Sequence, residues 1–357
     1  AGYAAGQALF MLAQSELAIV VARAFAGAGY RSVLVTSFVD SWEYPVPEGV
    51  ERISIEQEQL EQSRLKRNLS RIKALRKLIK KYRPRAIISF MAEPNFRSVL
   101  ASAFLPVKTI VSVRNDPERE YAGRLGRLVG KILLPLADGC VFQTEQARAW
   151  FPRRLQKKSR VIMNQVDESF FSDSGKGPEG YVMTAGRLTR QKNQALLIRA
   201  FAAIAPQVEQ ELRIYGEGEL RGELEELIKS LGMEKRIKLM GASDNMPQVL
   251  AGAGLFVLPS DYEGMPNALL EAMASGLCCI ATDCPCGGPE TIIDNSINGR
   301  LVPVGDEHAL RDAMLELLRD EDKRREMGAR ARSRAEDFRP EAIFEQWRQY
   351  VEIVTGG

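Results

Sequence analysis

Short apolar segments alternate with helix-length segments through the carboxy-terminal half of this chain. The apolar segments span residues 181–185, 212–216, 237–241, 255–260, 279–283 and 298–302. Between them, stretches of about ten to fourteen residues carry the apolar spacing of amphipathic helices. This alternation predicts an α/β fold with a parallel, doubly wound sheet, in which ligands bind outside the carboxyl ends of the strands.

The amino-terminal half shows the same alternation in a weaker form. Clear strands are expected at residues 32–36, 86–90, 109–113 and 139–143. The apolar pattern of residues 8–26 predicts one continuous helix, so we expect the first strand of this half to be absent from the sequence. The alternative is that residues 8–12 are that strand, followed by a very short loop.

The length of the chain indicates two domains. Its 357 residues exceed one ordinary domain and fit two. A stretch of Asp, Ser, Gly, Lys and Pro at residues 173–180 has the composition of a linker. We therefore expect an amino-terminal domain over residues 1–167, a linker over 168–180, a carboxy-terminal domain over 181–338 and a final helix over 339–357.

Two carboxylates, Glu263 and Glu271, flank the start of an apolar helix in the carboxy-terminal half. Glu263 lies in the loop before that helix, and Pro266 suits its first turn. The N–H groups at a helix start attract anions such as phosphate, and glycine lets a ligand approach the backbone. The residues expected to line this site are Gly264, Met265, Pro266, Asn267 and Ala268. A capped surface helix is the alternative interpretation.

Basic residues follow the expected strand at 181–185. Gly186 makes a turn, and Arg187 and Lys192 come next. An arginine offers a fork of donors and a lysine a point charge, which suits them to the two phosphates of a diphosphate. The alternative is an exposed basic loop.

Together these segments resemble the retaining glycosyltransferases of family 4, in which two glutamates separated by seven residues stand in a Glu-Gly-Phe/Met-Pro-Asn context. The resemblance is good over residues 180–305 and loose elsewhere. It implies that Glu263 contacts the donor sugar and that Glu271 holds the ribose. It also implies that Arg187 and Lys192 neutralise the donor diphosphate. Further donor contacts are implied for Gly186, Gly216, Met240 and Gly241.

The resemblance implies a GT-B fold, with two Rossmann-like doubly wound domains facing across a cleft and a final helix that crosses back to the first domain. The implied reaction moves a hexose or N-acetylhexosamine from a nucleotide-diphosphate sugar, with UDP as the expected nucleotide. The acceptor is a hydroxyl of a lipid-linked or cell-surface glycan, and the anomeric configuration is retained. Because cationic side chains and N–H groups would neutralise the diphosphate, we expect no metal and no cofactor.

Two parts of the family pattern are missing from the amino-terminal half. Many members have a donor-contacting histidine after the strand that corresponds to residues 109–113. This chain has Arg114, Asn115 and Asp116 there. Either one of them contacts the donor sugar in place of the histidine, or that contact is not needed. The usual Gly-Gly loop is also missing, which leaves Gly2 and Gly6 as phosphate-side candidates. Two other functions stay open, a GT-B nucleotide-sugar epimerase and a non-catalytic nucleotide- or glycan-binding subunit.

Charge divides the chain unevenly. Residues 1–165 carry 27 basic and 14 acidic residues, a net charge of +13, and the remainder carries −10. Residues 64–85 contain no acidic residue, and their helical pattern is expected to bury Leu69, Ile72 and Leu75. We expect this basic helix to face an anionic membrane surface, with a solvated helix face as the alternative. Nucleic acid is less favoured, because the chain has neither a basic motif with several interleaved aromatic residues nor a recognisable nucleic-acid-binding fold. The expected membrane residues are Arg64, Lys66, Arg67, Arg71, Lys73, Arg76, Lys77, Lys80 and Lys81.

The remaining sequence features bear on location and metals. No apolar run is long enough to span a membrane, and residues 1–30 lack a signal-peptide pattern. We therefore expect a cytoplasmic protein, peripheral on the cytoplasmic face of the inner membrane. The five cysteines and the single His308 do not match a structural zinc pattern, so free thiols and no metal site are expected.

Overall fold

The computed structural model describes residues 8–12, 16–37, 46–55, 63–172 and 180–356. The chain divides into two compact units, Ala1–Met163 with Phe344–Gly357, and Asn164–Ile343. The second unit begins before the linker expected at 168–180, because the segment from residue 164 packs on it. The Val166 N–H donates to the Phe338 carbonyl over 2.9 Å, and Phe171 is buried.

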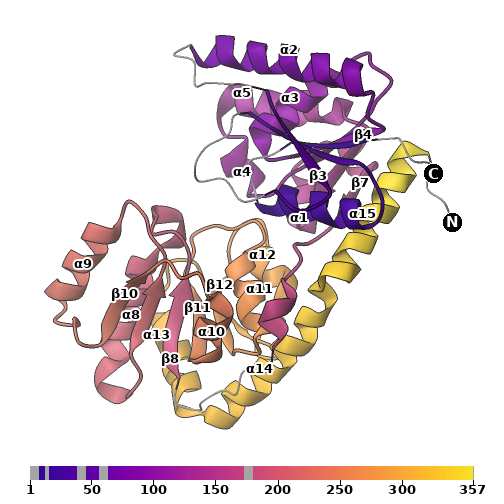
Figure 1. Ribbon diagram of the computed structural model, residues 1–357. Coiled ribbons are helices and arrows are strands. Elements are labelled where there is room, and N and C mark those ends of the chain that lie inside the picture. The colour runs from indigo at the N-terminus through magenta and orange to yellow at the C-terminus, as the bar shows by residue number, and fades with distance from the viewer. Residues whose placement is uncertain (1–7, 13–15, 38–45, 56–62, 173–179, 357) are drawn as a thin grey trace. The chain divides into compact units, whose positions relative to one another are not determined.

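The first unit is built on a parallel sheet that has seven strands in the described part of the chain (Figure 1). The sheet order is β3-β2-β1-β4-β5-β6-β7, so the first strand lies near the middle. The strands are β1 Leu9–Leu12, β2 Ser32–Thr36, β3 Val50–Ser54, β4 Ala86–Phe90, β5 Lys108–Ser112, β6 Gly139–Phe142 and β7 Ser159–Val161.

The expectation that the first strand is absent is wrong. Leu9–Leu12 forms β1, which pairs with β2 on one side and with β4 on the other. A separate helix, α1 Glu16–Gly27, follows. All four residues of β1 are buried, and a strand buried on both faces has a continuous apolar run that periodicity cannot distinguish from a helix.

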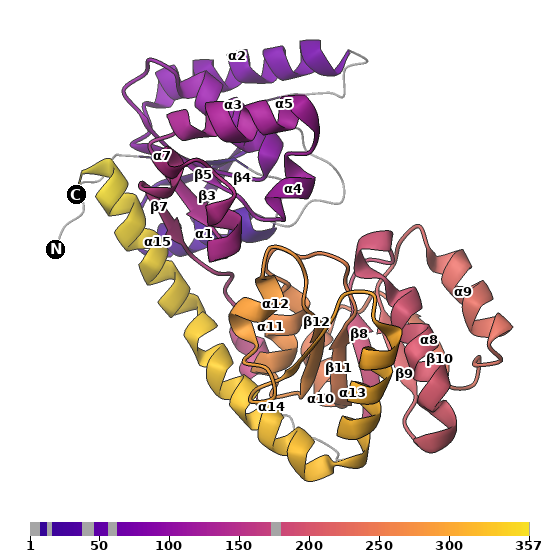
Figure 2. The same cartoon turned by 180° about the vertical axis from the view of Figure 1, so that it is seen from behind.

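Helices α2, α3 and α5 lie on one side of this sheet (Figure 2). The helix α2 packs through Leu75 and Ile79 into a core with Phe10 and Ile87. Leu69, expected to be buried, is 51% exposed, because it lies on the outer face of α2 with the lysines. The helices here are α2 Arg64–Tyr82, α3 Ala92–Ser102, α4 Pro117–Glu120, α5 Gly123–Leu128, η1 Val129–Leu133, η2 Leu134–Leu136, α6 Glu145–Ala149 and α7 Arg153–Gln156.

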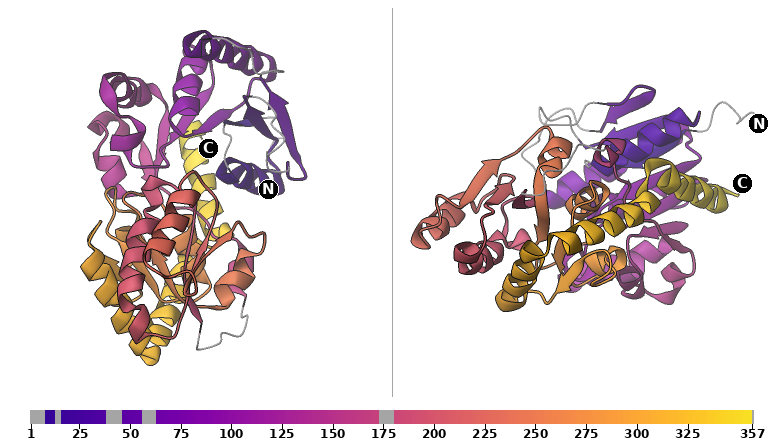
Figure 3. Two further views of the ribbon diagram at one scale, coloured as in Figure 1. Left: turned by 90° about the vertical axis from the view of Figure 1, so that its left-hand side faces the viewer. Right: turned by 90° about the horizontal axis from the view of Figure 1, so that it is seen from below.

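The last helix, α15 Pro340–Thr355, contributes most of its length to the first unit. Trp347 is buried with its ring centroid 5.8 Å from that of Phe90. The Tyr350 hydroxyl accepts a hydrogen bond of 2.7 Å from the Cys140 N–H, near the amino end of β6. The left view of Figure 3 shows the other side of this unit, with α2 as the purple helix at the top.

The second unit has a parallel sheet of six strands in its described residues, with the order β10-β9-β8-β11-β12-β13. The chain order reverses between β8 and β11, which is the switch point where doubly wound sheets bind ligands. The strands are β8 Tyr181–Ala185, β9 Leu212–Tyr215, β10 Ile237–Gly241, β11 Ala253–Leu258, β12 Cys279–Thr282 and β13 Arg300–Val302.

The helices of the second unit cover both faces of its sheet (Figure 1). They are α8 Gln194–Ile204, α9 Arg221–Ser230, α10 Met246–Ala251, α11 Asn267–Ala274, α12 Gly288–Ile292, α13 Glu307–Arg319 and α14 Glu321–Ala335. Short 3-10 turns lie at η3 Glu168–Phe171, η4 Arg190–Lys192, η5 Ala205–Gln207 and η6 Glu336–Phe338.

Candidate active site

The carboxyl edge of the second sheet is made of closely packed backbone. Gly216 follows β9 with φ of +133°, and a Cβ there would lie 2.0 Å from the Gly186 carbonyl oxygen. Its N–H donates to the Gly241 carbonyl over 2.8 Å. Only glycine fits at 216, and the three predicted donor-site glycines therefore form one continuous surface beside the switch point.

The turn η4, which follows β8, is fastened to the loop that follows β11. The Gln191 side chain donates to the Tyr262 carbonyl over 2.9 Å, and the Asp261 N–H donates back to the Gln191 carbonyl over 2.9 Å. The Asn193 side chain donates to an Asp261 carboxylate oxygen over 2.7 Å. These bonds span the switch point and fix the loops that carry Lys192 and Glu263.

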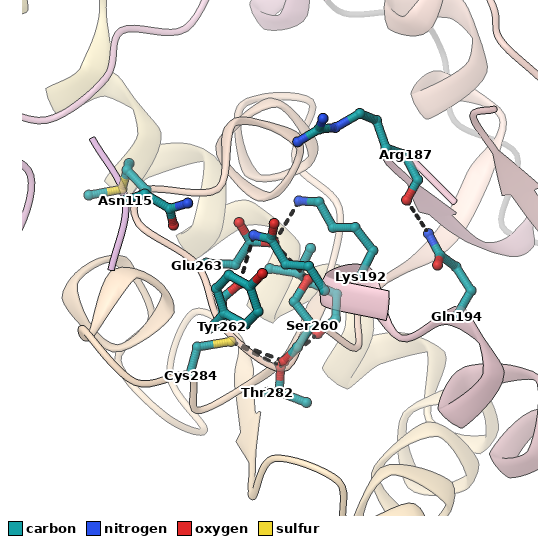
Figure 4. Close-up of polar contacts among 12 residues, drawn as sticks. Asn115, Arg187, Lys192, Gln194, Ser260, Tyr262, Glu263, Thr282 and Cys284 are labelled. Carbon is teal, nitrogen blue, oxygen red and sulfur yellow. Dashed lines mark hydrogen bonds and ion pairs between the residues drawn. The ribbon is translucent and has the colours of Figure 1, made fainter. Parts of the chain in front are cut away.

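Lys192 and Glu263 meet at this point in an ion pair (Figure 4). The Lys192 Nζ lies 2.6 Å from Glu263 Oε1, and the two side chains are only 18% and 7% exposed. Charges so far removed from water need partners close by, and here each side chain supplies the other's. Sequence analysis predicted both residues at the site but not that they would bind each other.

Buried polar groups beneath Glu263 hold its carboxylate in place. The Ser260 hydroxyl donates to Glu263 Oε1 over 2.6 Å. The Thr282 hydroxyl and the Cys284 thiol both donate to the Ser260 carbonyl, the thiol over 3.1 Å. Burial raises the pKa of Cys284 to about 12, so this thiol stays protonated and acts as a donor rather than as a nucleophile.

Arg187 is exposed, in contrast to Lys192. Its backbone carbonyl accepts a 3.0 Å bond from the Gln194 side chain, which fixes the loop. Its guanidinium has no hydrogen-bond partner among the described residues. In Figure 4 the side chains of Arg187 and Lys192 run in the same direction from this loop. Two cations thus lie at the switch point: in the described part of the chain, the Arg187 guanidinium has all its donors open, and the Lys192 ammonium is bonded to Glu263.

The start of α11 carries the other predicted donor contacts. Pro266, expected in the first turn, is instead the residue before the helix, which begins at Asn267. The Asn164 side chain donates to Asn267 Oδ1 over 2.5 Å and to the Met265 carbonyl over 3.4 Å. Within the described residues the N–H groups of Asn267 and Ala268 have no acceptor, which leaves them available to an anion.

The loop after β12 supports the same helix start through another glycine. A Cβ at Gly288 would lie 1.7 Å from the Gly264 carbonyl oxygen, so a side chain cannot be accommodated there. The two backbones are in direct contact at this point. Further along α11, Glu271 is half-buried, and Met240 beside the glycine surface is 44% exposed.

The three residues of the first unit that were expected to contact the donor sugar differ in the hydrogen bonds that their side chains make within the protein. The Asp116 carboxylate caps α4 by accepting from the Glu118 N–H over 3.0 Å, so it is committed to the fold. The Asn115 side chain accepts from the Asp116 N–H over 2.9 Å. Arg114 donates to the Ser112 hydroxyl, and burial lowers its pKa to about 9. Gly2 and Gly6 lie outside the described residues.

Glu120 is a half-buried acid of the first unit whose carboxylate is buried, and it was not predicted from the sequence. Its Oε1 accepts a 2.7 Å bond from the Ala92 N–H at the start of α3, and its Oε2 is buried with no partner among the described residues. Burial raises the pKa of Glu120 to about 7. Met91, just before α3, has an uncommon φ of +73°. Both residues line a hollow of about 370 Å³ at the carboxyl ends of β1, β2 and β4.

The basic residues of α2 are only partly available for a surface role. Arg76 donates to the carbonyls of Ala101 and Ala103 over 2.9 and 2.8 Å, so it serves packing. The exposed members are Lys66, Lys73, Lys77, Lys80 and Lys81, and the side chain of Arg64 lies outside the description. No helix in the described part of the chain is long and apolar enough to cross a membrane.

Within the described residues, no group of three or more His, Cys, Asp or Glu side chains is arranged to hold a metal ion. None of the five cysteines forms a disulfide, and all but Cys286 are buried.

Sequence analysis missed several residues that organise the site, chiefly Asn164, Ser260 and Cys284. Ser260 lies just after β11 and Cys284 just after β12. Because the carboxyl ends of parallel strands meet at one edge of the sheet, the strand order alone would have placed both residues there. Asn164 lies more than a hundred residues before its partners, and no local pattern marks it.

Two family models match consecutive parts of the chain. The model described as Glycosyltransferase Family 4 matches residues 16–170, and the model described as Glycosyl transferases group 1 matches residues 166–334. The two matches together span both units and confirm that the chain is a glycosyltransferase with the expected fold class.

Curated relatives include enzymes whose names specify lipid-linked substrates. One is the alpha-1,4-N-acetyl-D-galactosaminyltransferase of Campylobacter jejuni named for GalNAc-alpha-(1->4)-GalNAc-alpha-(1->3)-diNAcBac-PP-undecaprenol. It is 29% identical over 283 residues, which are 78% of this chain and 77% of the relative. Another is the UDP-Gal:alpha-D-GlcNAc-diphosphoundecaprenol alpha-1,3-galactosyltransferase of Escherichia coli, 32% identical over 46% of each chain.

Solved structures with low sequence identity share the fold over nearly the whole length. Sucrose-phosphate synthase from Thermosynechococcus elongatus aligns with a TM-score of 0.83 at 19% identity, covering 98% of this chain and 100% of its own. HepE from Anabaena, in complex with UDP, aligns with a TM-score of 0.79 at 18% identity, covering 97% and 100%. With these matches to both units, the chain belongs to the GT-B glycosyltransferases.

Proposed function

We propose that this protein transfers a hexose or N-acetylhexosamine from a UDP-sugar to a hydroxyl of a lipid-linked or cell-surface glycan, with retention of the anomeric configuration. The observation that carries the proposal is the cationic site at the switch point of the second sheet. Lys192 is paired there with Glu263, Arg187 lies exposed on the same loop as Lys192, and α11 begins four residues after Glu263 with open N–H groups. A nucleoside diphosphate needs this combination of charges and donors.

In this proposal the second unit binds the donor and stabilises the departing diphosphate. Arg187 offers its free guanidinium to one phosphate, and Lys192 offers the ammonium donors that its bond to Glu263 leaves open. The N–H groups of Asn267 and Ala268 face the developing charge from the helix start. Preorganised donors of this kind commonly supply the largest share of the rate enhancement.

Glu263 is then the group nearest the transferred sugar. Its Oε1 is held by Lys192 and Ser260, and Oε2 has no partner among the described residues and remains available to a sugar hydroxyl. The bond from the anomeric carbon to the acceptor oxygen forms on the face from which the diphosphate leaves. The acceptor proton passes to the leaving phosphate oxygen, which closes the proton balance without a covalent intermediate.

The acceptor class follows from the relatives and from the charge of the first unit. Two relatives carry the names of undecaprenyl diphosphate-linked substrates. Five exposed lysines lie along α2, and each basic residue near an anionic leaflet adds about 1 kcal/mol to membrane attraction. We therefore place the reaction at an anionic membrane surface, on the cytoplasmic face, with the chain bound peripherally.

The test is a transfer assay with a panel of nucleotide sugars. Thermal-shift measurements identify the sugar nucleotide that stabilises the protein, and the product formed with a polyprenyl diphosphate-linked acceptor is measured by mass. Proton NMR of the new linkage reports its configuration. An inverted linkage would refute retention, and conversion of the donor without acceptor would instead support an epimerase.

A further inference from the structure

An exposed apolar surface of the first unit lies outside α2, and its α3 end adjoins that helix through Arg76, which donates to the Ala101 and Ala103 carbonyls. It consists of Leu100 and Phe104, on and just after α3, and of Leu125, Leu128, Ile132 and Leu136, on the helical run α5–η1–η2. We call these six residues the apolar patch. Soluble monomeric domains rarely present a contiguous group of large apolar side chains, and such a group marks an interaction site.

The four members on the helical run form a stripe. Leu125, Leu128, Ile132 and Leu136 recur at intervals of three or four residues, which places them on one face of a helix. Leu125 is 74% exposed and Ile132 61% exposed. This is the pattern of an amphipathic helix with its apolar face turned outward rather than toward the core.

The opposite face of the same run is firmly packed, so the stripe is not a sign of loose structure. A Cβ at Gly130 would come within 2.9 Å of the Trp150 ring. Leu134 and Pro135 are buried, and the run packs against α3. The helical run therefore holds its outward stripe in a fixed orientation.

Leu100, Phe104 and Leu136 surround a common hollow of about 1000 Å³ at the amino ends of β4, β5 and β6. Phe104 is fully exposed, and its φ of +61° is uncommon for a residue other than glycine. The lining of the hollow also includes Arg83, and Lys108, whose ammonium pairs with Asp138 of the same lining over 3.1 Å. The hollow thus joins the α3 end of the patch to the helical run.

The charges around the patch have a single sign along the helical run. Arg124, Arg127 and Lys131 alternate with the apolar stripe, and no acidic residue occurs from 121 to 137. The Lys131 ammonium lies 4.8 Å from the centroid of the Trp150 ring. An apolar face bordered by basic residues matches the boundary between acyl chains and anionic headgroups, where long basic side chains reach back to the phosphates.

We propose that the apolar patch inserts shallowly into the acyl-chain boundary of an anionic lipid bilayer. This deepens the proposed function, because it adds a hydrophobic anchor to the electrostatic attraction of α2. The two contributions respond differently to salt, since screening weakens attraction between exposed charges but not the burial of apolar surface. A fraction of the protein bound to vesicles should therefore resist high salt.

The experiment is co-sedimentation of the full chain with vesicles of phosphatidylcholine containing phosphatidylglycerol, at low and high sodium chloride. Leu128→Ser with Ile132→Ser should lower the salt-resistant partition at least about tenfold and leave much of the low-salt binding intact. Ile297→Ser is the matched control, because Ile297 and Leu128 are both 52% exposed and Ile297 lies in the second unit. Complete release of the wild type by salt, or unchanged binding of the double variant, would overturn the proposal.

A second readout reports insertion directly. In a Phe104→Trp variant, lipids with brominated acyl chains should quench the added fluorescence on binding, and absence of quenching would contradict insertion.

If the Leu128→Ser, Ile132→Ser variant is a monomer where the wild type is a dimer, and its vesicle binding is unchanged, the patch is a self-association surface and the proposal fails. Transfer to a water-soluble acceptor should be the same in wild type and double variant. If the wild type transferred no sugar to any acceptor but still bound vesicles at high salt, the proposed function would be refuted and the membrane proposal would stand.

Discussion

Each unit has a helix start next to a loop of its sheet, and the two starts differ in whether their first N–H groups already have an acceptor. At α3 of the first unit, the first N–H is occupied by the chain's own acid, since Ala92 donates to Glu120. At α11 of the second unit, the N–H groups of Asn267 and Ala268 have no acceptor among the described residues, and two cations lie close by. Similar sheets, wound in the same order, thus keep one anion site closed and the other open.

The difference indicates where each unit can accept negative charge. A phosphate approaching α3 would have to displace a carboxylate that is already buried against the helix start. A phosphate approaching α11 meets open donors and the positive end of the helix. This difference supports the proposal that the diphosphate binds the second unit.

The largest expected effect tests the open site. Arg187→Ala and Lys192→Ala should each cost about 2–4 kcal/mol of transition-state stabilisation, because each removes a donor aimed at the developing charge. The measurement is kcat/KM for the donor at saturating acceptor. Arg190→Ala is the control, since Arg190 is an exposed cation of the same turn. Near-normal turnover in either Arg187→Ala or Lys192→Ala would contradict the assignment of that cation to the diphosphate site of the second unit.

The two glutamates of the second unit should separate binding from turnover. Glu263→Gln should lower kcat about 100-fold, because its sugar contact lies at the reacting ring. It should leave binding of free UDP unchanged or tighter, because Lys192 loses its ionic partner and turns to the phosphates. Glu271→Gln should weaken UDP binding, since a ribose contact is present in ground and transition states alike. Calorimetric titration of UDP into both variants measures this.

Those assignments would be reversed by one specific outcome. If UDP bound the Glu271 variant as tightly as wild type and bound the Glu263 variant poorly, Glu263 would be the nucleotide contact.

The closed site of the first unit should appear as a pH effect on stability. Burial raises the pKa of Glu120 from 4.5 to about 7, so between these values the native state holds more protons than the unfolded state. Stability contributed at this position is therefore present at low pH and falls as pH rises through 7. Between pH 5 and pH 8 the free energy of unfolding of the wild type should fall by an amount on the order of 2 kcal/mol that Glu120→Gln removes, as measured by urea unfolding at both pH values.

Glu118→Gln is the control for that comparison, because Glu118 is an exposed acid two residues away. Equal pH dependence in wild type and the Glu120 variant would mean that the carboxyl is ionised in the native state throughout.

The smallest expected effect concerns metals. Because two cations and a helix start already face the diphosphate, a chelator should leave the transfer rate unchanged. The assay compares turnover with excess EDTA and with added magnesium or manganese. Loss of activity in EDTA that either ion restores would show that the open site is incomplete without a metal.

Much of the second unit could be predicted from its sequence because its signals are local. Each strand is followed by a turn of marked composition, and the parallel order then places the turns at one edge. The ion pair between Lys192 and Glu263 could not be read in the same way, because it depends on the angle at which two loops meet. Asn164 was hidden for the same reason, since its partners lie on α11.

The first unit was harder because burial removes periodicity. The edge strands β3 and β7 were missed, because β7 has only three residues and β3 carries the polar Glu51 and Arg52 in a largely unburied segment. Glu120 looked like an ordinary surface acid within a charged segment, and only the packing of α3 against its loop makes it buried. Leu69 fitted the apolar spacing of α2 but lies just outside the face that packs.

Direct backbone contact between Gly264 and Gly288 also limits how this enzyme can change. A new side chain at position 288 cannot be absorbed locally, because it would push the start of α11 away from the loop after β12. Laboratory evolution of donor preference should therefore find few accepted substitutions on this glycine-lined floor. Variation is open to the side chains that stand above it, among them Met240 and Tyr262, so the same rigid base could be fitted to different sugars without being rebuilt.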